Sequence, residues 1–142
     1  MPMIDLYAPA GTFADTHAVA VRAASIVKDV EQVPDIPLFR NNTAAFVHEL
    51  PAASISDAVG GGDHVRVQVL TNDGALDRDK QIAVVRQLTD LVIEASGGAI
   101  AEDRVWVLLT EAVPGGWGLF GHAHTNEEIV AAARAEIARL TQ

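Results

Sequence analysis

An internal repeat is the feature that most constrains the fold of this chain. The sequence of 142 residues matches itself at an offset of about 62–63 positions. In each half, a short apolar run leads through a glycine-containing turn into a stretch with helical periodicity. The apolar runs are Met3–Ala8 and Val65–Thr71, and the helical stretches run from about Phe13 to Val30 and from about Asp77 to Ser96. Apolar residues recur within these stretches as expected for helices packed on a sheet.

Each helical stretch is followed by a second strand pattern, Ala44–Pro51 in the first half and Val105–Pro114 in the second. The chain is therefore predicted to be α+β, with two tandem β-α-β units forming a four-stranded sheet that carries its helices on one face. The units span about 2–51 and 64–114. A C-terminal loop and helix, 115–142, complete a single domain of residues 1–142. Thr125 and Glu128 have the spacing of a capping box and predict that this last helix starts there and reaches about Leu140.

Composition excludes several classes of function. The formal net charge is −9, with 10 Lys and Arg against 19 Asp and Glu, which argues against binding of nucleic acid or anionic membranes. The absence of cysteine excludes disulfides, thiol nucleophiles and Cys-based metal sites. No apolar stretch is long enough to span a bilayer, and no basic segment followed by an apolar region opens the chain. We therefore expect a cytoplasmic protein.

The predicted sheet has helices on one face only, and the terminal helix is too short to cover the other. Leaving an apolar surface of that size in water is costly. We therefore expect a closed oligomer in which the open sheet faces are buried against one another.

Pro2 is the strongest candidate for chemistry. It follows Met1 directly and opens the first strand pattern. A proline there can simply be a tolerated residue at the start of a strand. Loss of Met1, however, would expose a secondary amine that can act as a base or nucleophile. Retention of Met1 would leave an amide nitrogen without basicity.

Three segments resemble the tautomerase superfamily, whose members are built from β-α-β units and carry an amino-terminal proline. These segments are the Pro2 strand, the run Val69–Gly74, and Val105–Glu111 with the glycine-aromatic loop Gly116–Gly121. The resemblance implies that Pro2 is catalytic after loss of Met1. It also implies a homotrimer, since fused two-unit members are trimers. An apolar pocket would lower the pKa of the proline amine and make the neutral base available.

The resemblance also implies aromatic and amide contacts to the substrate. Trp117 falls where the family has an aromatic wall, and Phe120 continues the same loop. Asn72 could bind a carbonyl or carboxylate, although an Asn before Asp-Gly commonly just favours a turn. His122 could line the pocket and titrate near neutral pH. The spacing of His122 and His124 is too weak a signal for a metal site, and we predict none.

The arginines that relatives use to bind carboxylates are missing after the first and third strands, where Thr12, Asn72 and Ala75 stand. Arg40 is the nearest replacement cation. Asn41 falls where relatives that decarboxylate malonate semialdehyde have an aspartate that helps activate water. An amide can orient water but cannot take its proton.

These residues favour a keto–enol tautomerase for small α-keto or aromatic carboxylic acids, with Pro2 as general base and no cofactor. Two alternatives stay open. One is a decarboxylase or hydratase of the malonate semialdehyde type, and the other is a noncatalytic ligand-binding or interaction protein on the same scaffold.

Overall fold

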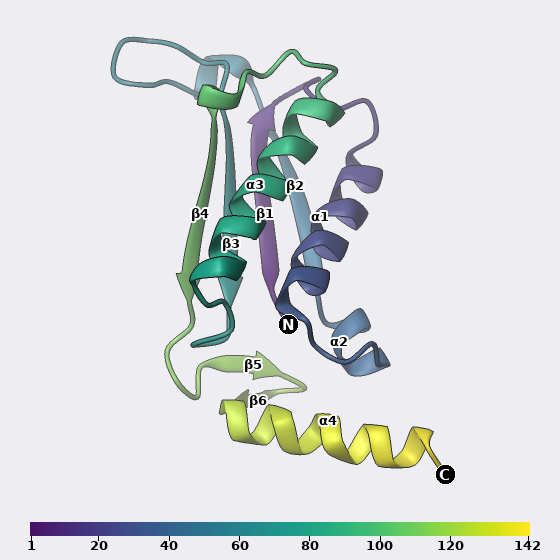
Figure 1. The fold of residues 1–142 in the computed structure, drawn as a ribbon. Coiled ribbons are helices and arrows are strands. Elements are labelled where there is room, and N and C mark those ends of the chain that lie inside the picture. The colour runs from purple at the N-terminus through teal and green to yellow at the C-terminus, as the bar shows by residue number, and fades with distance from the viewer.

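The computed structural model describes residues 1–142, with Met1 in place, and confirms the predicted α+β architecture. Two β-α-β units are followed by a hairpin and a terminal helix (Figure 1). The first unit contains β1 (Met3–Pro9), α1 (Thr16–Glu31) and β2 (Ala44–Leu50), with a short helix α2 (Pro37–Asn41) before β2. The second contains β3 (Val65–Thr71), α3 (Arg78–Ala95) and β4 (Val105–Glu111). The chain ends with β5 (Trp117–Leu119), β6 (His122–His124) and α4 (Asn126–Leu140).

The four long strands form one sheet in the order β2-β1-β3-β4. Strands within a unit are parallel, whereas β1 and β3 pair antiparallel at the centre. In that central pair Met3 lies opposite Leu70, and Tyr7 lies opposite Arg66. The start of β1 therefore lies beside the end of β3, and the start of β3 lies at the other end of the sheet.

The main core lies between the sheet and the two long helices. Figure 1 shows α1 and α3 side by side on the same face of the sheet. Alternate residues of the central strands point toward these helices and are fully buried, as the period of two in a strand requires. The members of this layer are Ile4, Leu6 and Ala8 of β1, Val65, Val67 and Val69 of β3, Val19, Ala23 and Val27 of α1, and Val84, Leu88, Leu91 and Val92 of α3.

Local caps set the helix boundaries. The side chains of Asp15 and Asp77 accept hydrogen bonds from main-chain N–H groups in the first turns of α1 and α3. The capping box between Thr125 and Glu128 is formed at the start of α4, as predicted. None of the helices is both long and apolar enough to cross a bilayer.

The open face of the sheet is more polar than predicted. Phe46, Trp106 and Leu108 are substantially exposed on the outer strands. Asp5 and Arg66 alternate with core residues of β1 and β3 and therefore share this open face. It is a mixed surface of aromatic, aliphatic and charged side chains.

Two elements that the sequence did not predict build the lower end of the molecule in Figure 1. Residues predicted as loops form α2 and the β5–β6 hairpin. The terminal helix α4 lies beneath the sheet end instead of against its open face. Hydrogen bonds link it to the β3–α3 turn and to α2: Asn126 Nδ2 donates to the Asp73 carbonyl oxygen at 2.9 Å, and the Leu38 N–H donates to Glu136 Oε2 at 2.9 Å.

Leu88 offers a test of the core. Its side chain is fully buried between α3 and the sheet, so Leu88→Ala should lower the free energy of unfolding by about 2–5 kcal/mol. Ile82→Ala on the same helix is the matched control, because Ile82 is 54% exposed and its loss should cost under about 1 kcal/mol. Urea unfolding at one protein concentration measures both. Equal destabilisation by the two variants would contradict this placement of α3.

Candidate active site

The chain's first residues lie at the end of the sheet, where three elements meet. The register of β1 and β3 brings them next to the turn that follows β3. The Ala44 N–H donates to the Pro2 carbonyl oxygen at 3.3 Å, which fixes Pro2 against the start of β2. Pro2 is buried. The predicted catalytic residue therefore lies inside the molecule, at the junction of β1, β2 and the end of α1.

The amine of Met1 is held by two side chains. It donates to Glu31 Oε1 at 3.1 Å and to Asn72 Oδ1 at 3.4 Å. Glu31 is the last residue of α1, and Asn72 directly follows β3. The site thus combines the start of the first unit with the strand end of the second.

Glu31 was not predicted from the sequence. It is buried, and Oε2 has no hydrogen-bond partner in the chain. Lys80 Nζ of α3 donates to the main-chain oxygen of Glu31 at 3.0 Å and so fixes the end of α1. A glutamate at a helix end is usually exposed to solvent, so the sequence gives no sign that Glu31 is buried. Its burial becomes apparent only when the N-terminus and α4 are placed around it.

Apolar side chains enclose the amine. Met1 is only 1% exposed and belongs to a compact group that we call the N-terminal cluster. Its other members come from three separate segments: Ile36 and Phe39 near α2, Trp117 of β5, and Ile129 and Ala133 of α4. The enclosure therefore combines the predicted helix α4 with two unpredicted elements, α2 and β5.

A cavity of about 260 Å³ opens beside the cluster. Met1, Glu31, Phe39, Asn72 and Ile129 are among its lining residues, and none of the lining residues is Lys, Arg or His. The polar side chains of the lining are two carboxylates, Glu31 and Asp73, and two amides, Asn72 and Asn126. The Met1 side chain fills the buried space immediately next to Pro2.

Burial lowers the pKa of the Met1 amine below its ordinary value, because desolvation penalises the charged form. Glu31 opposes that shift, both through its charge and through the hydrogen bond. The net direction of the pKa shift is downward. An amine at this position is therefore easier to deprotonate than one in water.

Three of the residues predicted for the site come together here. Asn72 contacts the amine directly, and Trp117, only 6% exposed, packs in the N-terminal cluster with Met1. Phe120 and Asn41 lie elsewhere, lining a separate cavity of about 410 Å³ between α2 and α4. Phe120 is 79% exposed and has φ of 55°, at the turn between β5 and β6.

Arg40 and His122 are occupied by other partners. Arg40 is exposed and forms an ion pair with Asp35 at 3.3 Å. His122 Nε2 lies 2.6 Å from Glu128 Oε2 at the start of α4. Main-chain N–H donation by Thr125, together with His122, holds the pKa of Glu128 below its ordinary value. The chain contains no group of three or more His, Asp or Glu side chains arranged to hold a metal ion.

With Met1 present, Pro2 is an amide and cannot act as a base. The amine of Met1 lies three bonds from the Pro2 nitrogen, so the two nitrogens are no more than about 4 Å apart. Removal of Met1 would therefore expose the Pro2 amine close to Glu31 and Asn72 and would vacate a buried volume beside it.

No protein-family model matches this sequence, and a search of curated proteins found no match. Solved structures do match. A structure of Pt0534 inactivated by 2-oxo-3-pentynoate has a TM-score of 0.73 at 19% identity, covering 89% of this chain and 98% of that one. N1, a member of the cis-3-chloroacrylic acid dehalogenase family, has a TM-score of 0.71 at 17% identity, covering 92% and 90%. An asymmetric trimer of a fused 4-OT, R7, has a TM-score of 0.70 at 15% identity, covering 90% and 98%.

These likenesses extend over nearly the whole chain, and every identity is below 20%. They show that the chain shares the fold of these structures, with two β-α-β units in one chain, which is the fold that the resemblance implied.

Proposed function

We propose that this protein is a keto–enol tautomerase for small α-keto or aromatic carboxylic acids, with Pro2 as general base after loss of Met1. The observation that carries the proposal is the buried N-terminal amine, paired with Glu31 inside an apolar cluster. An amine in such surroundings has a lowered pKa and can be neutral near physiological pH.

The reaction moves one proton. The neutral Pro2 amine takes the proton from the enol hydroxyl, which leaves an enolate and a prolinium ion. The electron pair of the enolate then takes that proton back at carbon, and the keto form and the neutral amine result. Glu31 stabilises the transient prolinium through its charge, and Asn72 is placed to hydrogen-bond the substrate oxygen.

The charges of the cavity orient the substrate. Because Glu31 is the buried carboxylate beside the amine and no lining residue is Lys, Arg or His, the aromatic or keto end of the substrate lies innermost, against Phe39. The substrate carboxylate faces the open mouth of the cavity. Arg40, which pairs with Asp35, takes no part in this arrangement.

We further propose that the protein is a homotrimer. The exposed Phe46, Trp106 and Leu108 on the open sheet face favour an assembly that covers this face. The structures of fused 4-OT proteins with this fold are described as trimers.

A second candidate function is hydration or decarboxylation of a small acid of the malonate semialdehyde type. The free Oε2 of Glu31 favours it, because a carboxylate can take a proton from water and Asn41 cannot. Retention of Met1 in the mature protein would instead favour a noncatalytic binding role.

The Pro2 mechanism is tested by changing the amine. Pro2→Ala should lower kcat/KM for ketonisation of phenylenolpyruvate by on the order of 10²-fold, because general base catalysis contributes about that much. A form with an acyl group on Pro2 should be inactive, since the nitrogen is then an amide. Intact mass establishes that Met1 is absent from the active form, and circular dichroism and size-exclusion chromatography control for folding and assembly. Unchanged turnover in either correctly assembled form would refute the mechanism.

Glu31→Gln separates the two enzymatic candidates. Glu31 raises the pKa of the amine, so the variant should have a lower amine pKa. Because the neutral amine is the base, the acidic limb of the kcat/KM profile for ketonisation should move to lower pH. Hydration or decarboxylation that uses Glu31 as the base should instead be lost at every pH.

Glu127→Gln, a change to an exposed carboxylate on α4, is the matched control and should leave the profile unchanged. An acidic limb that stays in place in Glu31→Gln, with Met1 removed, would show that Glu31 does not interact with the catalytic amine.

A further inference from the structure

We propose that an aminopeptidase can remove Met1 only before the N-terminal cluster closes, and that a chain that folds with Met1 in place stays in a stable form, the Met1 form, in which Pro2 is an amide. The removal is a hydrolysis. Water adds to the carbonyl carbon of Met1, the bond to the Pro2 nitrogen breaks, methionine leaves with the new carboxyl group, and Pro2 takes the proton. The consequence for activity rests on the proposed function of Pro2, whereas the protection of Met1 rests on its burial.

The Met1–Pro2 bond is fixed on both sides inside the molecule. Terminal residues of most domains are poorly ordered unless contacts tie them down. Here Met1 is only 1% exposed, and its amine donates to Glu31 at 3.1 Å and to Asn72 at 3.4 Å. Pro2 is buried as well, and its carbonyl oxygen accepts from the Ala44 N–H at 3.3 Å. The bond is therefore out of reach in the folded chain.

Cleavage of the folded chain requires an opened state. An aminopeptidase has to bind the free amine and the first peptide bond in its own active site. Releasing Met1 would leave Glu31 without its cationic partner, which is strongly unfavourable for a buried carboxylate. It would also transfer the Met1 side chain into water, and burial of such a side chain alone favours the closed state by on the order of 10- to 100-fold. The opened state is therefore rare.

The segments that enclose Met1 come late in the sequence. Trp117 belongs to β5, and Ile129 and Ala133 belong to α4. Figure 1 shows α4 beneath the end of the sheet where the N-terminus lies. A nascent chain therefore exposes Met1 until these segments have been made and have packed. Removal of Met1 is possible during that interval, and folding ends it.

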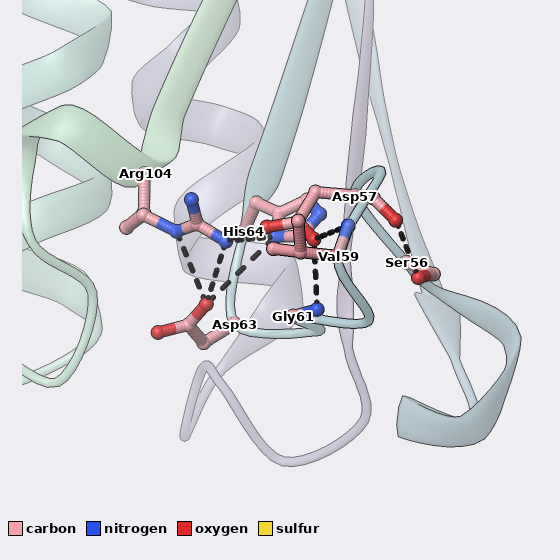
Figure 2. Close-up of polar contacts among 7 residues, drawn as sticks. All are labelled: Ser56, Asp57, Val59, Gly61, Asp63, His64 and Arg104. Carbon is pink, nitrogen blue, oxygen red and sulfur yellow. Dashed lines mark hydrogen bonds and ion pairs between the residues drawn. The ribbon is translucent and has the colours of Figure 1, made fainter.

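The opposite end of the sheet is closed by contacts that do not involve Met1. Figure 2 shows the guanidinium of Arg104 bound to Asp57, at 2.9 Å, and to Asp63, at 3.0 Å, in the loop between the two units. Asp57 also accepts hydrogen bonds from two main-chain N–H groups of the same loop. None of these residues belongs to the N-terminal cluster. A change at Arg104 can therefore weaken the fold without opening the enclosure of Met1.

Intact mass measures the protection directly. The Met1 form is released from an N-terminal fusion that leaves Met1 as the first residue, folded, and treated with a purified methionine aminopeptidase. A synthetic peptide of residues 1–8 is the accessible reference. The folded chain should lose Met1 at least about 100-fold more slowly than the peptide, because cleavage follows the population of the opened state. A rate less than about tenfold slower than that of the peptide would overturn the proposal.

Three variants separate opening of the cluster from loss of stability elsewhere. Ile129→Ala removes a buried side chain from the cluster and should speed the loss of Met1 by about tenfold or more. Leu140→Ala, at an exposed position of the same helix, should leave the rate unchanged, as should Arg104→Gln at the opposite end of the sheet. Circular dichroism establishes that each variant is folded. No acceleration in folded Ile129→Ala, or equal acceleration in Arg104→Gln, would contradict protection by the cluster. If Ile129→Ala does not fold, the comparison with the peptide still decides.

The order of removal and folding is tested in a purified translation system that contains a deformylase. The aminopeptidase is added either during synthesis or after the chain has folded. Only the first sample should lose Met1 and ketonise phenylenolpyruvate. Equal loss of Met1 in both samples would overturn the proposed order. Loss of Met1 in the first sample alone, without activity in either, would refute the proposed function of Pro2 and leave the protection of Met1 supported.

Discussion

The antiparallel pairing of β1 with β3 is the constraint on which the rest of the structure depends. Each β-α-β unit alone would leave one edge of its first strand unpaired. Joining the two units through these strands makes a single sheet and one continuous core beneath α1 and α3. The same pairing places the starts of the two units at opposite ends of the sheet. Pro2 therefore lies at the same end of the sheet as Asn72 from the other unit, and His64 lies at the end where β1 finishes.

Burying the N-terminal amine together with Glu31 removes two charged groups from water, and this desolvation costs free energy. A buried ion pair contributes little net stability unless additional hydrogen bonds satisfy its atoms. Here Glu31 keeps one oxygen without a partner, although its other oxygen binds the amine. Replacing Glu31 alone by an apolar residue would leave the buried amine without a partner and would destabilise the fold. Glu31 therefore compensates the buried amine, and only its second oxygen is unused within the chain.

The fold could be predicted because its signals are local and occur twice. Strand and helix periodicities, aspartate caps and the Thr125 capping box each depend on residues a few positions apart.

The site was predictable only in part. Pro2, Trp117 and Asn72 were identified through the resemblance, and Met1, the neighbour of Pro2, contacts Asn72 and shares a cluster with Trp117. Glu31 was missed because its burial depends on segments about 30 and 100 residues away in sequence, namely Met1 and α4. Arg40 and His122 were assigned by position, but their nearest carboxylates, Asp35 and Glu128, determine their orientation.

The pKa of the Pro2 amine is the measurement that tests the account most directly. It can be obtained by following the ¹⁵N signal of the terminal proline through a pH titration, in labelled protein whose intact mass shows the loss of Met1. The account predicts a value below the ordinary α-amino value of about 7.7–8.0, because an apolar enclosure disfavours the ammonium more than Glu31 stabilises it. A value at or above the ordinary one, or a chain that keeps Met1 in its native host, would contradict it.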